Sequence, residues 1–282
     1  MPTRTKHRQR PLRIFLGLAM VVVSIVFAFP VLWAVMTSLK SPSELIASPP
    51  VWVPTDPQWS NYTTVLSNTP VVRYLMNSFV IVAGTVAVTL VVCVPAAYGL
   101  SRFVFRGKAT LSNAVLAAQL FSPVVLAIPL YSLLAKLGLL NNYPTLILVY
   151  AALIVPFITW FLKGYFDTIP GELDEAALID GVGRAGALWH AVLPAARPGI
   201  ASAVVFSIVM SWSQFVVPFI LLDKSTLYPV SVGLVTLQST TGEITTHYLA
   251  AGAVIAVAPV VVLFVLLQRH IVSALTQGAV KG

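Results

Sequence analysis

Long uncharged stretches alternate along the chain with short charged connections. Six stretches without Asp, Glu, Lys or Arg are long enough to cross a bilayer as a helix, which takes about 20 apolar residues. They span residues 14–39, 74–101, 109–135, 137–162, 198–222 and 244–268. The pattern predicts an all-α integral membrane protein with six transmembrane helices.

Two further segments look different from these six. Residues 225–242 are uncharged but rich in Ser, Thr and Gly, and Pro229 interrupts them, so we predict an extracellular loop or a short re-entrant segment. The connection 40–73 holds six prolines, which disfavour regular helix. Its aromatic residues Trp52, Trp59 and Tyr62 suit the membrane interface. We predict an irregular loop at the headgroups.

Composition and charge support a membrane protein and set its orientation. Only 9% of the 282 residues are charged, against about 25% in a soluble protein. The net charge of +8 follows the topology and does not indicate nucleic acid: 13 of the 17 Lys and Arg residues lie on one side of the six predicted crossings. Because Lys and Arg are in excess in cytoplasmic loops, both termini are predicted to be cytoplasmic.

The basic tail before the first stretch raises the question of a signal peptide. The stretch has 26 uncharged residues, more than the 7–15 of a signal-peptide core, and it lacks a clear small-x-small cleavage pattern. We predict an uncleaved first helix. The predicted organisation is a cytoplasmic tail over 1–13, a transmembrane domain over 14–270 and a second cytoplasmic tail over 271–282.

Two segments resemble cofactor-binding motifs, but each lacks neighbouring residues or structure that its motif requires. Residues 181–186 match G-x-G-x-x-G, but a helix-forming segment stands where the dinucleotide fingerprint needs a strand. Beside Gly107-Lys108, Arg102 and Ala109 replace the Gly and Ser or Thr of a phosphate loop. The four histidines lack metal-ligand spacing, and Cys93 is the single cysteine. We predict no enzyme activity, metal or cofactor in this chain, so that a partner would bind any ATP and Mg²⁺.

The six apolar stretches contain no charged residues, and this limits the transport mechanisms that fit the sequence. Ion-coupled carriers retain ionisable residues within the membrane for function. Their absence here favours a pore whose energy arrives from outside the bilayer. A secondary carrier that works without an ATPase remains the alternative, and uptake by the chain alone in proteoliposomes would establish it.

Polar uncharged residues within the stretches allow two interpretations. Such side chains often bond to neighbouring helices, a contribution of about 0.6–2 kcal/mol. Alternatively they line a path for a hydroxyl-rich solute, with an indole stacked on a sugar ring. The candidates for this path are Gln119, Ser122, Trp212, Ser213 and Gln214.

The connection 167–198 is long and unusually acidic for a turn between two membrane helices. A helix is predicted to begin within 170–175, since acids in a first turn complement the positive end of the helix dipole. Gly181 and Gly183 allow a sharp turn, and a second short helix over 185–192 is predicted to end at Pro194. Two short helices on the cytoplasmic surface would form a docking site for a soluble partner.

Several short motifs together resemble a known family. Glu175-Ala176-Ala177, then Asp180-Gly181 and Leu193-Pro194, are similar to the "EAA" loop of permease subunits in bacterial ABC importers. Over nearly its whole length the chain resembles the second permease of carbohydrate importers of the maltose-permease type. Other matching pieces are Asn61-Tyr62, Asn77-Ser78, the segment 98–103, the segment 105–108 and the terminal segment 278–282.

The resemblance implies a function and a set of partners. The EAA loop would dock into a cytoplasmic ATPase, with the coupling residues Glu175, Ala176, Ala177, Asp180, Gly181, Leu193 and Pro194. The C-terminal tail, with Gln277 and Lys281, would also reach the ATPase dimer. A second permease would complete the pore in the bacterial cytoplasmic membrane, two ATPase subunits would bind ATP and Mg²⁺, and an extracytoplasmic binding protein would deliver a sugar or related polyol.

Overall fold

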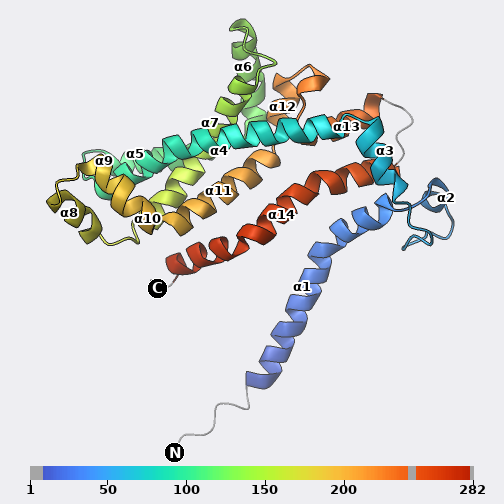
Figure 1. Ribbon diagram of the computed structural model, residues 1–282, viewed down its shortest axis with the longest axis horizontal. Coiled ribbons are helices and arrows are strands. Elements are labelled where there is room, and N and C mark those ends of the chain that lie inside the picture. The colour runs from blue at the N-terminus through green and yellow to red at the C-terminus, as the bar shows by residue number, and fades with distance from the viewer. Residues whose placement is uncertain (1–8, 241–245, 280–282) are drawn as a thin grey trace, which may run out of the picture. The chain divides into compact units, whose positions relative to one another are not determined.

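The computed structural model describes the backbone of residues 9–240 and 246–279, and the side chains of 15–237 and 246–266. All regular secondary structure within these ranges is helical (Figure 1). The chain forms two compact units, one of residues 1–70 with 237–257, the other of residues 71–236 with 258–282. Each unit is described by itself.

Four helices in the described part of the chain are long and apolar enough to cross a membrane. Their candidate spans are Phe15–Ser38, Val71–Arg102, Tyr143–Phe166 and Thr246–Leu266. Two bent pairs of helices would raise the number to six if each pair forms one span: Lys108–Ala118 with Pro123–Lys136, and Arg184–Ala195 with Arg197–Trp212. The six apolar stretches are therefore helical, but only four of them are single long helices.

The first unit contains α1 (Gln9–Ser38), α2 (Pro42–Leu45) and α3 (Ser60–Asn68). Apolar side chains of α1 between residues 15 and 33 are exposed, as suits a helix surrounded by lipid or by another protein. Asn61 holds α3 against the end of α1, donating to the carbonyl oxygens of Ser38 at 2.9 Å and Lys40 at 3.1 Å. The predicted irregular loop is thus wrong in part, because two short helices form within it.

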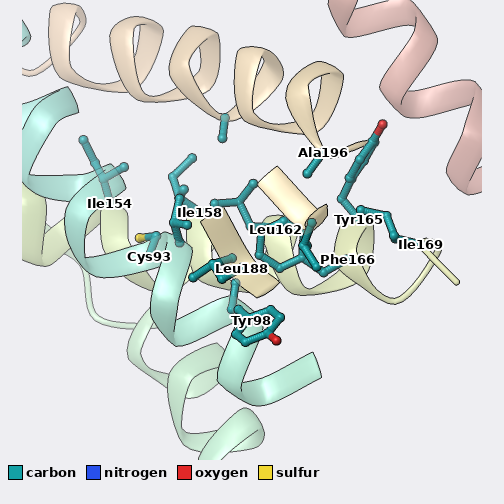
Figure 2. Packing of buried hydrophobic residues seen from close by; sticks show 14 residues of the cluster. Cys93, Tyr98, Ile154, Ile158, Leu162, Tyr165, Phe166, Ile169, Leu188 and Ala196 are labelled. Atoms are coloured by element: carbon teal, nitrogen blue, oxygen red, sulfur yellow. The ribbon is translucent and has the colours of Figure 1, made fainter. Parts of the chain in front are cut away.

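In the second unit, α4 (Val71–Arg102), α7 (Tyr143–Phe166) and α11 (Arg197–Trp212) pack on one another. Their main core includes Cys93, Ile154, Ile158 and Ala203 (Figure 2). The contact between α7 and α11 depends on Gly199, since a Cβ built there would lie 2.5 Å from two ring atoms of Tyr165. A side chain at position 199 would push the two helices apart.

The third apolar stretch is broken into α5 (Lys108–Ala118) and α6 (Pro123–Lys136), which meet at 90°. The break follows from local chemistry. Pro123 takes the first turn of α6, where a missing N–H costs nothing, and the Ser122 hydroxyl accepts the Val124 N–H at 3.3 Å as an N-cap. The fourth stretch starts late for the same kind of reason: α7 begins at Tyr143 behind Asn142, whose side chain accepts the Thr145 N–H at 3.4 Å.

The fifth apolar stretch is also interrupted. It forms α11 and the short α12 (Val216–Leu221), separated by residues 213–215. At 1.5 Å per residue, the 16 residues of α11 extend about 24 Å, less than the ~30 Å hydrocarbon core. Beyond η2 (Ser225–Leu227), most of the segment expected to be a loop or a short re-entrant segment forms the helix α13 (Val230–Thr240). Pro229 stands just before this helix, where proline is tolerated.

Two residues that carry the family resemblance hold this region on α4. Asn77 donates to the carbonyl oxygens of Thr226 at 3.0 Å and Tyr228 at 2.9 Å. The Ser78 hydroxyl accepts the Val230 N–H at 2.8 Å. The final helix, α14 (Thr246–Ala279), continues through most of the predicted C-terminal tail. Gln277 lies on it, whereas Lys281 and residues 1–8 of the predicted N-terminal tail lie outside the described residues.

Candidate functional site

The acidic segment after α7 folds as the sequence predicts for its first half. Helix α8 (Glu172–Ile179) has three acids in its first turn, Glu172, Asp174 and Glu175. Carboxylates there interact favourably with the unpaired N–H groups and the positive end of the helix dipole. These carboxylates compensate for the N-cap residue Gly171, which has no side chain to accept a hydrogen bond.

Gly181 ends α8 in a defined turn. It has φ +81°, in the left-handed region that favours glycine. The Gly181 N–H donates to the Leu178 carbonyl and the Val182 N–H to the Ala177 carbonyl, both at 3.1 Å. This pair of bonds is a Schellman motif with Gly181 at the position just after the C-cap. The sharp turn expected from the sequence is present and has a specific geometry.

Most of the predicted coupling residues lie on the outside of this helix. Glu175, Ala176, Asp180 and Gly181 are exposed and Ala177 is half-buried. Exposed apolar side chains lie among them: Ile179 is 85% exposed, Leu178 41% and Leu173 39%. An acidic helix that displays isoleucine and leucine to solvent has the composition of an interaction surface rather than of a solvated face.

The second half of the segment is one irregular helix rather than a short helix ending at Pro194. It runs through α9 (Arg184–Ala187), a π-helical turn (Leu188–Val192) and α10 (Leu193–Ala195). The Leu193 N–H donates to the Leu188 carbonyl, five residues back, and Pro194 has no N–H to donate to a carbonyl of the preceding turn. The chain then bends by 83° into α11.

This irregular helix buries one of its faces in the core of the unit. Leu188 and Val192 are buried in the main core, with Leu193 packed against it. Figure 2 shows Leu188 in the same cluster as Tyr98 of α4 and Leu162 of α7. Leu193, one of the predicted coupling residues, is half-buried against this core, whereas Pro194 is exposed.

A network of charged and polar side chains fixes α8 to the end of α4. The Tyr98 hydroxyl donates to Oδ1 of Asp174 at 2.6 Å, and the Arg102 Nε pairs with Oδ2 of the same carboxylate at 2.8 Å. A second guanidinium nitrogen of Arg102 donates to the Ile169 carbonyl at 2.9 Å. The ion pair is sheltered, with side-chain exposures of 15% for Arg102 and 13% for Asp174.

A second set of contacts joins the end of α4 to the end of α7. The Ser101 hydroxyl donates to Oδ1 of Asp167 at 2.7 Å, and Lys163 of α7 pairs with Oδ2 at 2.7 Å. The Arg184 guanidinium lies over the Phe103 ring at 5.0 Å, within the range of a cation–π contact. Sequence reasoning noted the segment 98–103 only as part of the resemblance. The spacing of Tyr98 and Arg102 by four residues, which places both on one face of α4, was a usable signal.

The candidate solute-path residues lie at helix breaks. Gln119 and Ser122 are exposed in the bend between α5 and α6, and Ser213 and Gln214 follow the end of α11. Local chemistry accounts for part of this polarity, since the Ser122 hydroxyl caps α6 and the Ser213 hydroxyl donates to the Met210 carbonyl at 3.3 Å. Their role in a solute path stays a prediction.

Trp212 has a different setting from the other candidates. It packs edge-on against Phe79 with ring centroids 5.2 Å apart. Both rings line a cavity of about 430 Å³, together with Val82, Val86 and Ile208. This lining is apolar, so the cavity offers ring surface but few hydrogen-bond partners to a hydroxyl-rich solute.

Comparison with known proteins establishes the family. Residues 6–277 match the family model of the binding-protein-dependent transport system inner membrane component. The chain belongs to this family. As a member of this family, the protein is a transport permease. Its long apolar helices agree with this membership.

Relatives of this permease match it over nearly the full length. It is 34% identical over 275 residues to the sulfoquinovosyl glycerol transport system permease protein SmoH of Agrobacterium fabrum, covering 97% of this chain and 94% of the relative. It is 32% identical over 273 residues to the trehalose/maltose transport system permease protein MalG of Thermococcus litoralis, covering 96% and 97%.

A solved structure shares the fold of this permease. A chain from the crystal structure of a bacterial ABC transporter involved in the import of the acidic polysaccharide alginate superposes with a TM-score of 0.79. The match covers 95% of this chain and 99% of the other at 21% identity. The chain therefore shares its overall fold with that chain of the solved transporter.

Proposed function

We propose that this permease is a pore-forming subunit of an ATP-driven importer of a sugar or related glycoside. It would sit in the bacterial cytoplasmic membrane with both termini cytoplasmic, beside a second permease, two ATPase subunits and an extracytoplasmic binding protein. ATP and Mg²⁺ would be bound by the ATPases, and alternating access would follow from their closure. Family membership supports transport, and the relatives' names support the sugar class: sulfoquinovosyl glycerol, trehalose/maltose, diacetylchitobiose and maltodextrin.

The observation that carries the proposed coupling site is the outer face of α8. Glu175 and Ile179 are four residues apart, so they share one face of the helix, and Asp180 follows at its end. Ile179 is 85% exposed on this acidic surface. A partner that buries Ile179 in an apolar pocket rimmed by Lys or Arg would complement it in shape and charge. The ATPase subunit is the proposed owner of that pocket.

Ile179→Asp tests this assignment, with Ile46→Asp as the matched control. Ile46 has nearly the same exposure, 86%, but lies after α2 in the other unit. Burying an isoleucine contributes about 1.5–3 kcal/mol, or roughly a ten- to hundredfold change in affinity. We expect co-purification of the ATPase with the permease to fall by about that factor for Ile179→Asp alone.

Reconstitution separates this function from the carrier alternative. The complex with its binding protein, in proteoliposomes with ATP inside, should take up solute only when the ATPase is present. Equal ATPase binding by both Asp variants would remove α8 as the docking surface. Uptake by the permease without any ATPase would overturn the proposed function as a whole. Screening glycosides for stimulated ATP hydrolysis would identify the solute.

A further inference from the structure

We propose that Tyr98 and Arg102 are positioning residues that transmit a displacement of α8 to the membrane helices. The inference rests on the proposed function, since it assumes that an ATPase moves α8. It assigns a role to side chains at the end of α4, which do not lie on the docking surface. The ion pair and hydrogen bonds around Asp174 would act as a clamp between the helix that is pushed and the helix that must move.

The clamp is strong because one carboxylate is held through both of its oxygens. Tyr98 and Arg102, four residues apart on α4, reach Asp174 at 2.6 and 2.8 Å. The Tyr98 contact is a hydrogen bond to a charged group, which is about twice as strong as a neutral one, whereas the Arg102 Nε contact is an ion pair without hydrogen-bond geometry. With only 15% and 13% of the two ionic side chains exposed, salt screens the pair much less than a surface pair.

The clamp also fixes the turn before α8. Arg102 donates to the Ile169 carbonyl at 2.9 Å, and Ile169 is buried in the core beside Phe166 of α7. Ser101 adds its bond to Asp167 at 2.7 Å. Helix α8 therefore cannot slide along α4 without separating a sheltered charge from its partner, so a displacement of α8 carries the end of α4 with it.

Docking and clamping use different sides of the same short helix. Asp174 and Ile179 are five residues apart, which places them about 140° from each other around the helix axis. Glu175 and Ile179, by contrast, are separated by about 40°. A partner can cover the outer face while the inner carboxylate stays bound to α4. A helix that passes a displacement from a partner to α4 needs two such separate faces.

A purely architectural role makes a different prediction from transmission. If the clamp only holds the fold, its loss should reduce assembly and all activity together. If it transmits motion, complexes that lack it should assemble and hydrolyse ATP but transport less solute per ATP. The deciding quantity is therefore the ratio of solute transported to ATP hydrolysed, measured in the reconstituted full complex.

The experiment is a double-mutant cycle of Arg102→Ala and Asp174→Asn, with Arg106→Ala as the charge-matched control. Arg106 is exposed in the turn after α4. We expect each clamp variant to lower solute per ATP by about tenfold, within the usual range of coupling free energies. The double variant should also fall about tenfold rather than a hundredfold, because both changes break one interaction. Arg106→Ala should couple like the unmodified permease.

Each outcome bears on the inference. Unchanged coupling in Arg102→Ala, or independent losses that multiply in the double variant, would overturn it while the proposed function stands. Loss of ATPase assembly in Arg102→Ala, Asp174→Asn and Tyr98→Phe alike would overturn it too, because the contacts would then serve the fold. Failure of the unmodified permease to assemble with any ATPase would instead defeat the proposed function.

Discussion

Replacing Gly181 by alanine should loosen the end of α8 without creating a clash. No heavy atom outside the chain neighbours lies within 4 Å of a Cβ built at Gly181, so the cost comes from the backbone alone. A residue with a Cβ in the left-handed conformation costs about 1–2 kcal/mol. The Schellman bonds of Gly181 and Val182 would then open about 5- to 30-fold more often.

Gly183→Ala is the matched control for this change. Gly183 is two residues away, also has open space around its Cβ position, and has φ −56°, which any residue adopts. Alanine there should be neutral or slightly stabilising, since it reduces the freedom of the unfolded chain. The two variants differ in backbone conformation and little else.

Hydrogen exchange measured by mass spectrometry would follow the amides of residues 180–182. In Gly181→Ala their protection should fall by about 5- to 30-fold, while core amides of α7 keep theirs. If the segment docks as proposed, ATPase stimulation by solute should weaken as well. Equal exchange in the two alanine variants would refute the strain argument, and a large loss in the core of α7 would mean that the change acts elsewhere.

Three other changes test separate parts of the structure. Gly199→Ala should destabilise the permease by about 1–3 kcal/mol through overpacking against Tyr165, seen as a lower thermal midpoint in detergent. Ser122→Ala should cost about 0.5–2 kcal/mol and Ser122→Asn much less if the residue is a cap, whereas a solute contact would affect transport instead. Hydrogen bonds, chiefly from the Thr55 hydroxyl, lower the Glu44 pKa from 4.5 to about 2. Their stabilisation of the loop around α2 should persist above pH 4.5 and fade as pH falls towards 2. This pH dependence should vanish in Glu44→Gln, which limited proteolysis across pH would detect.

Helical stretches could be predicted from the sequence because lipid solvation demands long uncharged runs. Helix breaks were harder to predict, since they depend on caps and prolines within those runs. Ser122 and Pro123 start α6 inside an uninterrupted apolar stretch, a few residues after α5 ends at Ala118. Hydropathy averages over such positions, so 109–135 resembled one crossing although the chain turns by 90° there.

The helix α8, which carries the proposed docking surface, could likewise be predicted from local chemistry. Acids at a helix start and glycine after its end determine α8 with little help from the rest of the chain. The clamp could not be predicted in this way, because Arg102 and Asp174 lie 72 residues apart in sequence and meet only when α4 and α7 pack. The half-burial of Leu193 against the core could not be predicted either, because it depends on the same packing of distant helices, and its coupling role stays a prediction.

This difference bears on how such a permease can couple to a partner. A docking surface that folds from local signals keeps its shape while the rest of the chain moves, since its Schellman turn and first-turn acids belong to α8 itself. A connection built from long-range contacts, by contrast, depends on which helices are packed together at each step. Arg102 connects the locally folded α8 to the long-range contacts, because it contacts both Asp174 of α8 and the Ile169 carbonyl at the core. In the proposed alternating access, an inward- and an outward-facing state would therefore share one rigid α8 and differ in the helices behind it, provided that the ion pair survives the transition.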